Sequence, residues 1–398
     1  MSISEPPAPE RRGVAHVAIV AMLVVANLGL VAFGARLSGG RFGSDSAESP
    51  LNPPLSPQRL DARSVLRNAD YFRWICDRVR DRRGILFFGT SESGPLHNLG
   101  VQLNDIRPDD PALTVLPVKG MSPIHSALVF SRTKREGIPL PPVILVINLV
   151  YFTESHDVID DGWMSIAIRS PIFLQFDTGG LRENLDSGVR EAFDVHFRGR
   201  TFLAPLLYQQ YAGNLMYLES HPAAPGVLPT DIPPPERYHF DGRRPEYDPL
   251  RNVARGYTPS DQLSKGRWRV RSESECVNLK GVENTARLLR DESAPTLMVI
   301  LPVNRPFYRS EGLDMAEFDA RYDAMRRRIA QQAVPDHLFV VDMYAEPALD
   351  AGFLDRMHAD EYGNHQLAEA LAVLPEYRRF IEAVRAYYGQ AGAERPGS

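Results

Sequence analysis

The sequence predicts an α/β fold, in which helices cover both faces of a doubly wound, mostly parallel sheet. Five short runs have the continuous apolar character of strands that are buried on both faces. Stretches with helical periodicity alternate with these runs, which is the pattern of a parallel sheet. Polar residues fall just past the ends of three of the runs, namely Ser91, Asn148 and Asn304. Because sites in such sheets form at the carboxyl ends of the strands, these three residues mark the expected functional edge.

The expected elements follow in chain order. Strands are predicted at residues 85–88, 113–116, 143–147, 296–301 and 337–341. Helices are predicted at residues 61–80, 124–136, 282–291, 315–332 and 363–387. The first of these helices is typical, because its apolar side chains recur at helical spacing and Gly84 then opens the first strand.

Residues 13–35 form a run of 23 residues without a charged side chain, which is long enough to cross a membrane as one helix. A cleaved signal peptide is the alternative, although its apolar region would span only about 7–15 residues. Arginines stand on both sides of the run, at Arg11 and Arg12 before it and at Arg36 and Arg41 after it. Their distribution leaves the orientation of the anchor open.

Four regions surround or interrupt the predicted fold. Residues 1–12 form a short tail before the anchor, and residues 36–58 are a linker rich in Pro, Gly and Ser. The main domain then extends over residues 59–398, with an insertion at residues 153–275. A gap of this length is too long for a plain loop and predicts a helical cap or subdomain of unassigned role.

Composition excludes several classes of protein. A net charge of −5 gives no electrostatic footprint for nucleic acid, and no Gly-rich phosphate loop indicates a nucleotide cofactor. The two cysteines, Cys76 and Cys276, rule out a disulfide scaffold, but one bridge between them or two free thiols both stay open. His97, His125 and His365 lack the spacing of metal ligands, so neither metal nor cofactor is expected.

Ser91 is the candidate nucleophile, in the run Gly-Thr-Ser-Glu at residues 89–92. A serine hydroxyl needs a base to take its proton, and Gly89 suits the tight turn that would expose the serine after a strand. Ser93 stands where an α/β-hydrolase elbow has its second glycine, so that motif fits badly. A helix-capping role for Ser91 and Ser93 as the nucleophile are the alternatives.

Asp355 and His358 are the candidate orienting acid and general base. Three residues apart on one helical turn, they would share a face. The aspartate could then accept a hydrogen bond from one imidazole nitrogen while the other nitrogen takes the proton of a serine. A solvated polar turn is the plain alternative, and Asp360 competes for the orienting role.

The order of these blocks resembles the SGNH (GDSL-like) hydrolases, which carry Ser after the first strand, Gly after the second, Asn after the third and Asp-x-x-His near the end. The matching blocks are residues 89–92, 119–122, 147–152 and 355–358. More narrowly, the run Leu-Pro-Val-Asn-Arg-Pro-Phe-Tyr at 301–308, the helix with Tyr322, and Asp-x-x-His followed by Gly363-Asn364 resemble the DltD family. The resemblance covers about residues 84–152 and 296–370.

The resemblance implies a role for each matching residue. Ser91 would be the nucleophile, His358 the base and Asp355 its orienter. The backbone N–H groups of Ser91 and Gly120, together with the Asn148 side chain, would form an oxyanion hole. Asn148 departs from the usual block, because Leu follows it where Asp is expected, and a strand-end cap is the alternative.

Asn304 and Tyr308 follow the fourth strand, and the resemblance makes them candidates for the substrate pocket. A turn-stabilising role is the alternative for both residues.

These observations together predict a membrane-anchored, serine-dependent acyltransferase or esterase that acts on cell-envelope polymers, with D-alanyl transfer through an acyl-Ser91 intermediate as its DltD-like form. Implied partners are the membrane, a cell-surface polymer or acylated carrier as substrate, and a multi-spanning membrane O-acyltransferase. The domain would face the periplasmic or extracytoplasmic side of the inner (plasma) membrane. The alternatives are an SGNH-type polysaccharide O-acetyltransferase or acetylesterase, and a non-catalytic assembly partner of a membrane O-acyltransferase.

Overall fold

The computed structural model describes residues 69–89, 98–116, 122–159, 181–197, 232, 234–242, 268–310, 312–344, 352–353 and 358–393. The predicted tail, membrane anchor and linker lie outside these residues. Among the described helices, none has both the length and the apolar character needed to cross a membrane.

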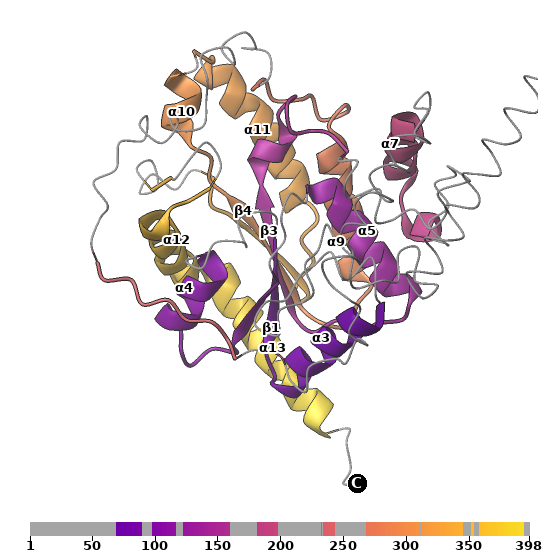
Figure 1. Cartoon of the computed structure of the whole chain (residues 1–398), viewed down its shortest axis with the longest axis vertical. Coiled ribbons are helices and arrows are strands. Elements are labelled where there is room, and N and C mark those ends of the chain that lie inside the picture. The colour runs from indigo at the N-terminus through magenta and orange to yellow at the C-terminus, as the bar shows by residue number, and fades with distance from the viewer. Residues whose placement is uncertain are drawn as a thin grey trace, which may run out of the picture.

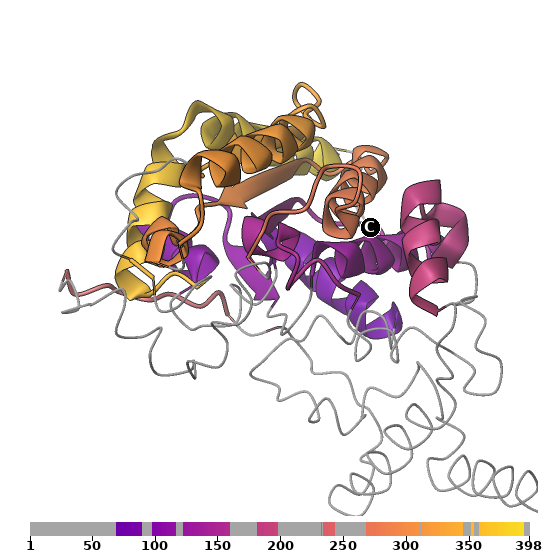
Figure 2. The ribbon, with the colours of Figure 1, turned by 90° about the horizontal axis from the view of Figure 1, so that it is seen from above.

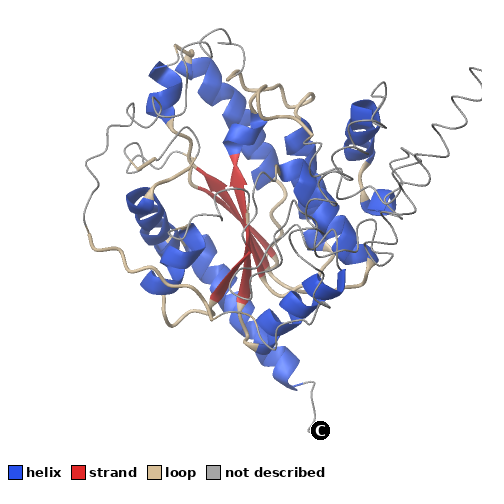
Figure 3. Cartoon of the chain, viewed as in Figure 1, coloured by secondary structure: helices blue, strands red, loops and turns tan. Residues whose placement is uncertain are grey.

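The core of the fold is a sheet of five strands, all parallel, in the order β2-β1-β3-β4-β5 (Figure 1, Figure 3). The strands are β1 (Ile85–Phe88), β2 (Leu113–Leu116), β3 (Val143–Asn148), β4 (Thr296–Leu301) and β5 (Leu338–Asp342). This order confirms the predicted doubly wound parallel sheet. The chain proceeds from β1 to one edge and then returns to β3 on the other side, so the topological switch point lies between β1 and β3. Ligand sites of such sheets lie at the carboxyl ends of these two strands.

Helices cover both faces of the sheet (Figure 2). Leu86 and Phe88 point to one face and Ile85 and Phe87 to the other, as the alternation of a strand requires. What we call the α9 face is covered by α3 (Ala69–Asp81), α5 (Pro123–Arg135), α9 (Val277–Arg290) and α11 (Met315–Ala330). What we call the α12 face is covered by α4 (Leu99–Ile106), α12 (Glu361–Val373) and α13 (Pro375–Ala393).

The predicted strands agree closely with the observed ones. Three have the predicted bounds, β3 gains Asn148, and β5 is displaced by one residue. The helix predicted at residues 282–291 begins earlier, at Val277, because the N-cap Cys276 accepts a hydrogen bond from the backbone of Leu279. Of the helix predicted at residues 61–80, the part from Ala69 onward is described and is helical.

The prediction of one continuous helix near the end of the chain is wrong. Residues 363–387 form two helices rather than one, since α12 ends at Val373 and α13 begins at Pro375. Proline has no backbone N–H to donate and disfavours helical backbone at the residue before it. Leu374 accordingly adopts an extended conformation, with φ −67° and ψ 140°. The helices α4 and α10 (Arg305–Ser310) were not predicted at all.

The predicted insertion at residues 153–275 is described only in parts. One part is helical and contains η3 (Leu181–Asn184) and α7 (Ser187–Phe197). Another part, residues 234–242, lies across α4 and α12, where the carbonyl of Glu236 accepts a hydrogen bond from Asn104 at 2.9 Å and the ring of Phe240 packs 4.8 Å from that of His365. The helical character of the rest of the insertion stays a prediction.

The two cysteines are free thiols and both are buried. Cys76 lies in α3 and Cys276 caps α9, so each is part of the core of the α9 face. Burial raises the pKa of both thiols, which keeps them protonated and chemically inert. The structure thus decides between the bridge and the free thiols that the sequence left open.

Candidate active site

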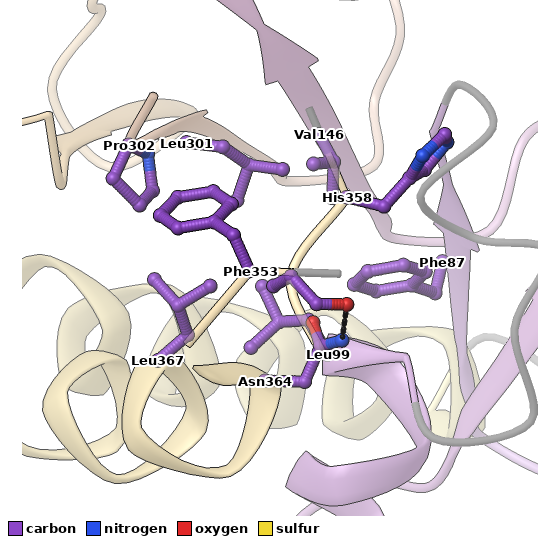
Figure 4. Close-up of a pocket in the computed structure, with 10 residues that line it drawn as sticks. Phe87, Leu99, Val146, Leu301, Pro302, Phe353, His358, Asn364 and Leu367 are labelled. Atoms are coloured by element: carbon purple, nitrogen blue, oxygen red, sulfur yellow. Dashed lines mark hydrogen bonds between the residues drawn. The ribbon is translucent and has the colours of Figure 1, made fainter. Parts of the chain in front are cut away.

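A pocket lies on the α12 face at the carboxyl ends of β1, β3 and β4 (Figure 4). Its walls are mostly apolar, and His358 and Asn364 are the polar side chains among them. The lining residues are Phe87, Leu99, Val146, Leu301, Pro302, Phe353, His358, Ala359, Asn364 and Leu367. In Figure 4 the imidazole of His358 lies at the edge of this group, beside Val146 and Phe87. The pocket thus adjoins the switch point between β1 and β3.

His358 belongs to a segment that precedes α12, not to the helix itself. The next residue, Ala359, forms an isolated antiparallel bridge with Phe353, and Asp360 is the N-cap of α12. The expected helical turn that would place Asp355 and His358 on one face is therefore wrong for His358, because the helix begins three residues later. Asp355 itself lies outside the described residues.

The segment that carries His358 is held against α12 by a close backbone contact. A Cβ atom added to Gly363 would lie 2.0 Å from the carbonyl oxygen of Gly352, so only glycine fits here. The same carbonyl accepts a hydrogen bond from the backbone of Asp360 at 2.9 Å. The Asp360 side chain in turn accepts a hydrogen bond from the N–H of Gly363 at 2.7 Å. Asp360 thus caps the start of α12, whereas the sequence offered it as an alternative to Asp355 for orienting His358.

Ser91 lies outside the described residues, as does Gly120, but the chain on both sides of Ser91 is defined. Phe87 precedes it by four residues and lines the pocket together with His358. Four residues of extended chain span at most about 14 Å. Leu99, on the other side, lines the same pocket, and the N-cap of its helix α4 is Asn98. The capping alternative for Ser91 therefore does not apply to α4.

Asn148 ends β3 and is completely buried. Its side-chain oxygen accepts a hydrogen bond from the backbone of Val150 at 2.9 Å and so caps the 3₁₀ helix η2 (Leu149–Phe152). This agrees with the strand-end cap that the sequence offered as an alternative. The bond uses the oxygen of the amide, whereas an oxyanion would require its NH₂ group, so capping and oxyanion binding are compatible in one side chain.

Asn304 and Tyr308 are also completely buried, and neither lines the pocket beside His358. The Asn304 side chain accepts a hydrogen bond from the backbone of Phe307 at 3.1 Å, in the first turn of α10. Tyr308 packs against Trp268, Phe307 and Phe318, with ring centroids 4.8–5.9 Å apart. The Asn304 geometry agrees with the turn-stabilising alternative, and Tyr308 belongs to an aromatic cluster of the core.

The start of α5 follows the loop after β2 and is ordered by a buried histidine. His125 Nδ1 lies 2.9 Å from the Ser122 hydroxyl and accepts a hydrogen bond from the Ser122 backbone at 3.3 Å. Burial, with a smaller contribution from the charge of His196, lowers the pKa of His125 to about 3. His125 is therefore a neutral acceptor that fixes the backbone two residues after Gly120.

Sequence reasoning missed a buried polar residue behind this edge, Asn278 near the start of α9. Its amide makes three hydrogen bonds to two other segments of the chain. A single asparagine inside an amphipathic helix has no periodic signature, so no sequence signal would have found it. In the part of the chain that the structure describes, no group of His, Cys, Asp or Glu side chains could hold a metal ion.

Comparison with known proteins adds no assignment: no protein-family model matches this chain, and no curated protein matches it either.

Proposed function

We propose that this chain is a serine-dependent acyltransferase or esterase with the layout of the SGNH hydrolases, and that it resembles the DltD family most. The observation that carries the proposal is the position of His358, which lines one pocket with Phe87 and Leu99 at the carboxyl edge of the sheet. These two residues flank the segment of Ser91 in the chain. An imidazole therefore shares a pocket with the residues on both sides of the segment in which the resemblance places the nucleophile.

In the proposed reaction, His358 accepts the proton of the Ser91 hydroxyl while Ser91 Oγ bonds to the acyl carbon of the donor ester. The bond from the acyl carbon to the leaving oxygen then breaks, and His358 gives its proton to that oxygen. Water or a polymer hydroxyl resolves the acyl-Ser91 ester by the same steps in reverse. Asp355 orients the imidazole and stabilises its charge.

The developing oxyanion would be bound by the backbone N–H groups of Ser91 and Gly120 and by the Asn148 side chain. The apolar pocket walls support this chemistry, because hydrogen bonds to a developing charge are worth more where water is excluded. Removal of one such donor typically costs about 2.7–4 kcal/mol of transition-state stabilisation.

The proposal includes a location and a substrate class. Residues 13–35 would anchor the domain to the inner membrane, with the pocket on the extracytoplasmic side. There the enzyme would act on a cell-envelope polymer or an acylated carrier, beside a multi-spanning membrane O-acyltransferase. Sedimentation of the full-length chain with membranes, and its release on deletion of residues 1–35, tests the anchor separately from the chemistry.

The chemistry is tested by labelling the full-length protein with a fluorophosphonate, followed by mass spectrometry of the modified peptide. We expect one label on Ser91, loss of the label in Ser91→Ala, and an unchanged label in Ser93→Ala, the matched control two residues away. Labelling that survives in Ser91→Ala contradicts the proposal. Labelling that is lost only in Ser93→Ala shows that Ser93 is the nucleophile.

The acyl group is identified by trapping. Incubation of the labelling-competent protein with acetylated or D-alanylated donor, followed by intact mass measurement, distinguishes an acetyl ester from an alanyl ester on Ser91. If Ser91→Ala, His358→Ala and Asp355→Asn all retain function in polymer modification, the chain is instead a non-catalytic assembly partner.

A further inference from the structure

We propose that Asn278 is a positioning residue for the oxyanion side of the candidate active site. The buried amide of Asn278 connects the segment after β3, which directly follows Asn148, to the start of α5, and so fixes the place of the Asn148 side chain. This inference rests on the proposed function and adds a residue that the resemblance does not supply.

The amide of Asn278 makes three hydrogen bonds to backbone groups far away in sequence. Its side-chain oxygen accepts from the N–H of Ile124 at 3.0 Å, in the first turn of α5. Its NH₂ group donates to the carbonyl of Tyr151 at 2.8 Å and to that of His156 at 3.1 Å. One completely buried side chain thus joins the start of α5 to the segment that follows β3.

Asn278 is itself held in place. Its backbone N–H donates to the Asp157 carboxylate at 2.8 Å, and that of Val277 donates to the same carboxylate at 3.1 Å. The Asp157 carboxylate, which is nearly buried, also lies 3.7 Å from Arg271 Nε. These contacts place a negative group at the N-terminus of α9, where the helix dipole favours it.

The backbones of α9 and α5 touch one turn beyond Asn278. A Cβ atom added to Gly281 would lie 2.4 Å from the Cα atom of Ile124. Because the two helices are in direct contact, the amide of Asn278 has little freedom to follow a displaced loop. The hydrogen bonds to Asn278 therefore set the position of the backbone after β3.

The segment that Asn278 holds is short and begins with the candidate oxyanion donor. Asn148 caps η2, and Tyr151 lies within the same four-residue helix. A second contact holds the same helix, since the Tyr322 hydroxyl donates to the carbonyl of Leu149 at 2.9 Å. Two buried donors thus fix the carbonyls one and three residues after Asn148. A misplacement of about 1 Å at a reacting centre can cost about 100-fold in rate, so such anchoring has catalytic consequences.

Asn284 provides a matched comparison on the same helix. It is also an asparagine, also completely buried in α9, and its side-chain oxygen accepts a backbone hydrogen bond, from Asp186 at 2.5 Å. Its partner belongs to the insertion and not to the loops at the carboxyl edge of the sheet. Loss of each amide should disturb packing in a similar way, but only Asn278 should affect the reaction.

The test compares Asn278→Asp with Asn284→Asp in the full-length protein. The introduced carboxylate keeps an acceptor for the N–H of Ile124 but loses both donors to the carbonyls of Tyr151 and His156. We measure kcat and KM for a p-nitrophenyl ester and the second-order rate of fluorophosphonate labelling. For Asn278→Asp we expect kcat and the labelling rate to fall about 10- to 100-fold, with KM changed less than about threefold. For Asn284→Asp we expect both rates within about threefold of the wild type.

Equal rates in the two variants overturn the inference, as does a change in KM alone for Asn278→Asp. If Asn278→Asp does not fold, as judged by circular dichroism, Asn278→Ser replaces it. The shorter serine side chain removes the hydrogen bonds to the carbonyls of Tyr151 and His156 without adding a charge. Failure of the proposed function has a different signature: the wild type is then not labelled on Ser91, or Ser91→Ala keeps its activity. A labelled, active wild type with an equally active Asn278→Ser therefore refutes only the positioning role.

Discussion

The two faces of the sheet support the same carboxyl edge by different means. On the α9 face, buried polar groups such as Asn278, Asp157 and His125 hold the backbone after β2 and β3 through hydrogen bonds. On the α12 face, His358 stands in an apolar pocket whose walls are held by close packing. The α9 face thus holds groups that must stay fixed, whereas the α12 face holds the proposed base, which must change its charge.

Physical reasons favour this division. A buried polar network is rigid only when each polar group in it has a hydrogen-bond partner. Such a network fixes the orientations of its groups as well as the distances between them. A general base needs instead an environment that lets it gain and lose a proton, and His358, the proposed base, is half-buried. The residues on either side of it, Gly352 and Gly363, are in close backbone contact. The following predictions test this contrast between the faces, from the largest expected effect to the smallest.

The largest effect is expected from His358→Ala, which removes the proposed base from the α12 face. General acid–base catalysis contributes typically about 10²–10⁴-fold, so kcat should fall by this factor. The control is His365→Ala on the same face, whose Nδ1 lies 3.2 Å from the Gln102 side chain. We expect its kcat to stay within about threefold of the wild type. The measurement is the rate of ester hydrolysis by both purified variants. Equal losses of kcat would show that His358 is not the general base.

The second prediction concerns the pH dependence of stability on the α9 face. Because the pKa of His125 is lowered to about 3 in the folded protein, the unfolded chain binds a proton more readily between pH 6.5 and 3. The contribution of His125 to stability is thus complete above pH 6.5 and falls by about 1.4 kcal/mol per pH unit below it. Urea unfolding at pH 7, 6 and 5 should show a shallower loss for His125→Asn than for the wild type. Parallel curves would mean that His125 does not titrate differently in the two states.

The third prediction tests close packing on the α12 face. Gly363→Ala places a methyl group against the carbonyl of Gly352 and should cost about 1–3 kcal/mol of unfolding free energy. It should also lower kcat, because the segment of His358 must move. Gly389→Ala is the control, since its added Cβ meets nothing within 4 Å in the interior of α13. There alanine should stabilise the protein by about 0.5–1 kcal/mol. Thermal unfolding and ester hydrolysis are measured for both; a stable, fully active Gly363→Ala contradicts the packing argument.

The smallest effects are expected from one hydroxyl on each face. Tyr322 donates to the carbonyl of Leu149 at the carboxyl edge, and Tyr388 donates to that of Gly84 at the amino end of β1, at 2.6 Å. Replacement of either by phenylalanine should cost about 1 kcal/mol of stability. Only Tyr322→Phe should also reduce kcat, because only its partner adjoins Asn148. A similar loss of kcat in Tyr388→Phe would show that general destabilisation, not loop position, controls the rate.

Much of the fold could be predicted, because its signals are local. Strands buried on both faces need continuous apolar runs, and all five were located to within one residue. Pro375 was also visible and should have divided the last predicted helix, since its chemistry is independent of context. The short helices α4 and α10 escaped prediction, because each has fewer than nine residues and its start depends on caps from Asn98 and Asn304.

The sequence by itself predicted which residue types could carry the proposed acyl transfer, and that Ser91, Asn148 and Asn304 would lie just past strand ends. Only the tertiary structure decided their neighbours. It placed His358 in a pocket with Phe87, in the segment before α12 rather than on a helical turn, and it buried Asn304 and Tyr308 outside that pocket. It also gave Asn278 its partners, which lie more than 100 residues away along the chain. The reason is physical: periodicity records which side of an element is buried, whereas a hydrogen bond between distant segments exists only after the sheet has brought them together.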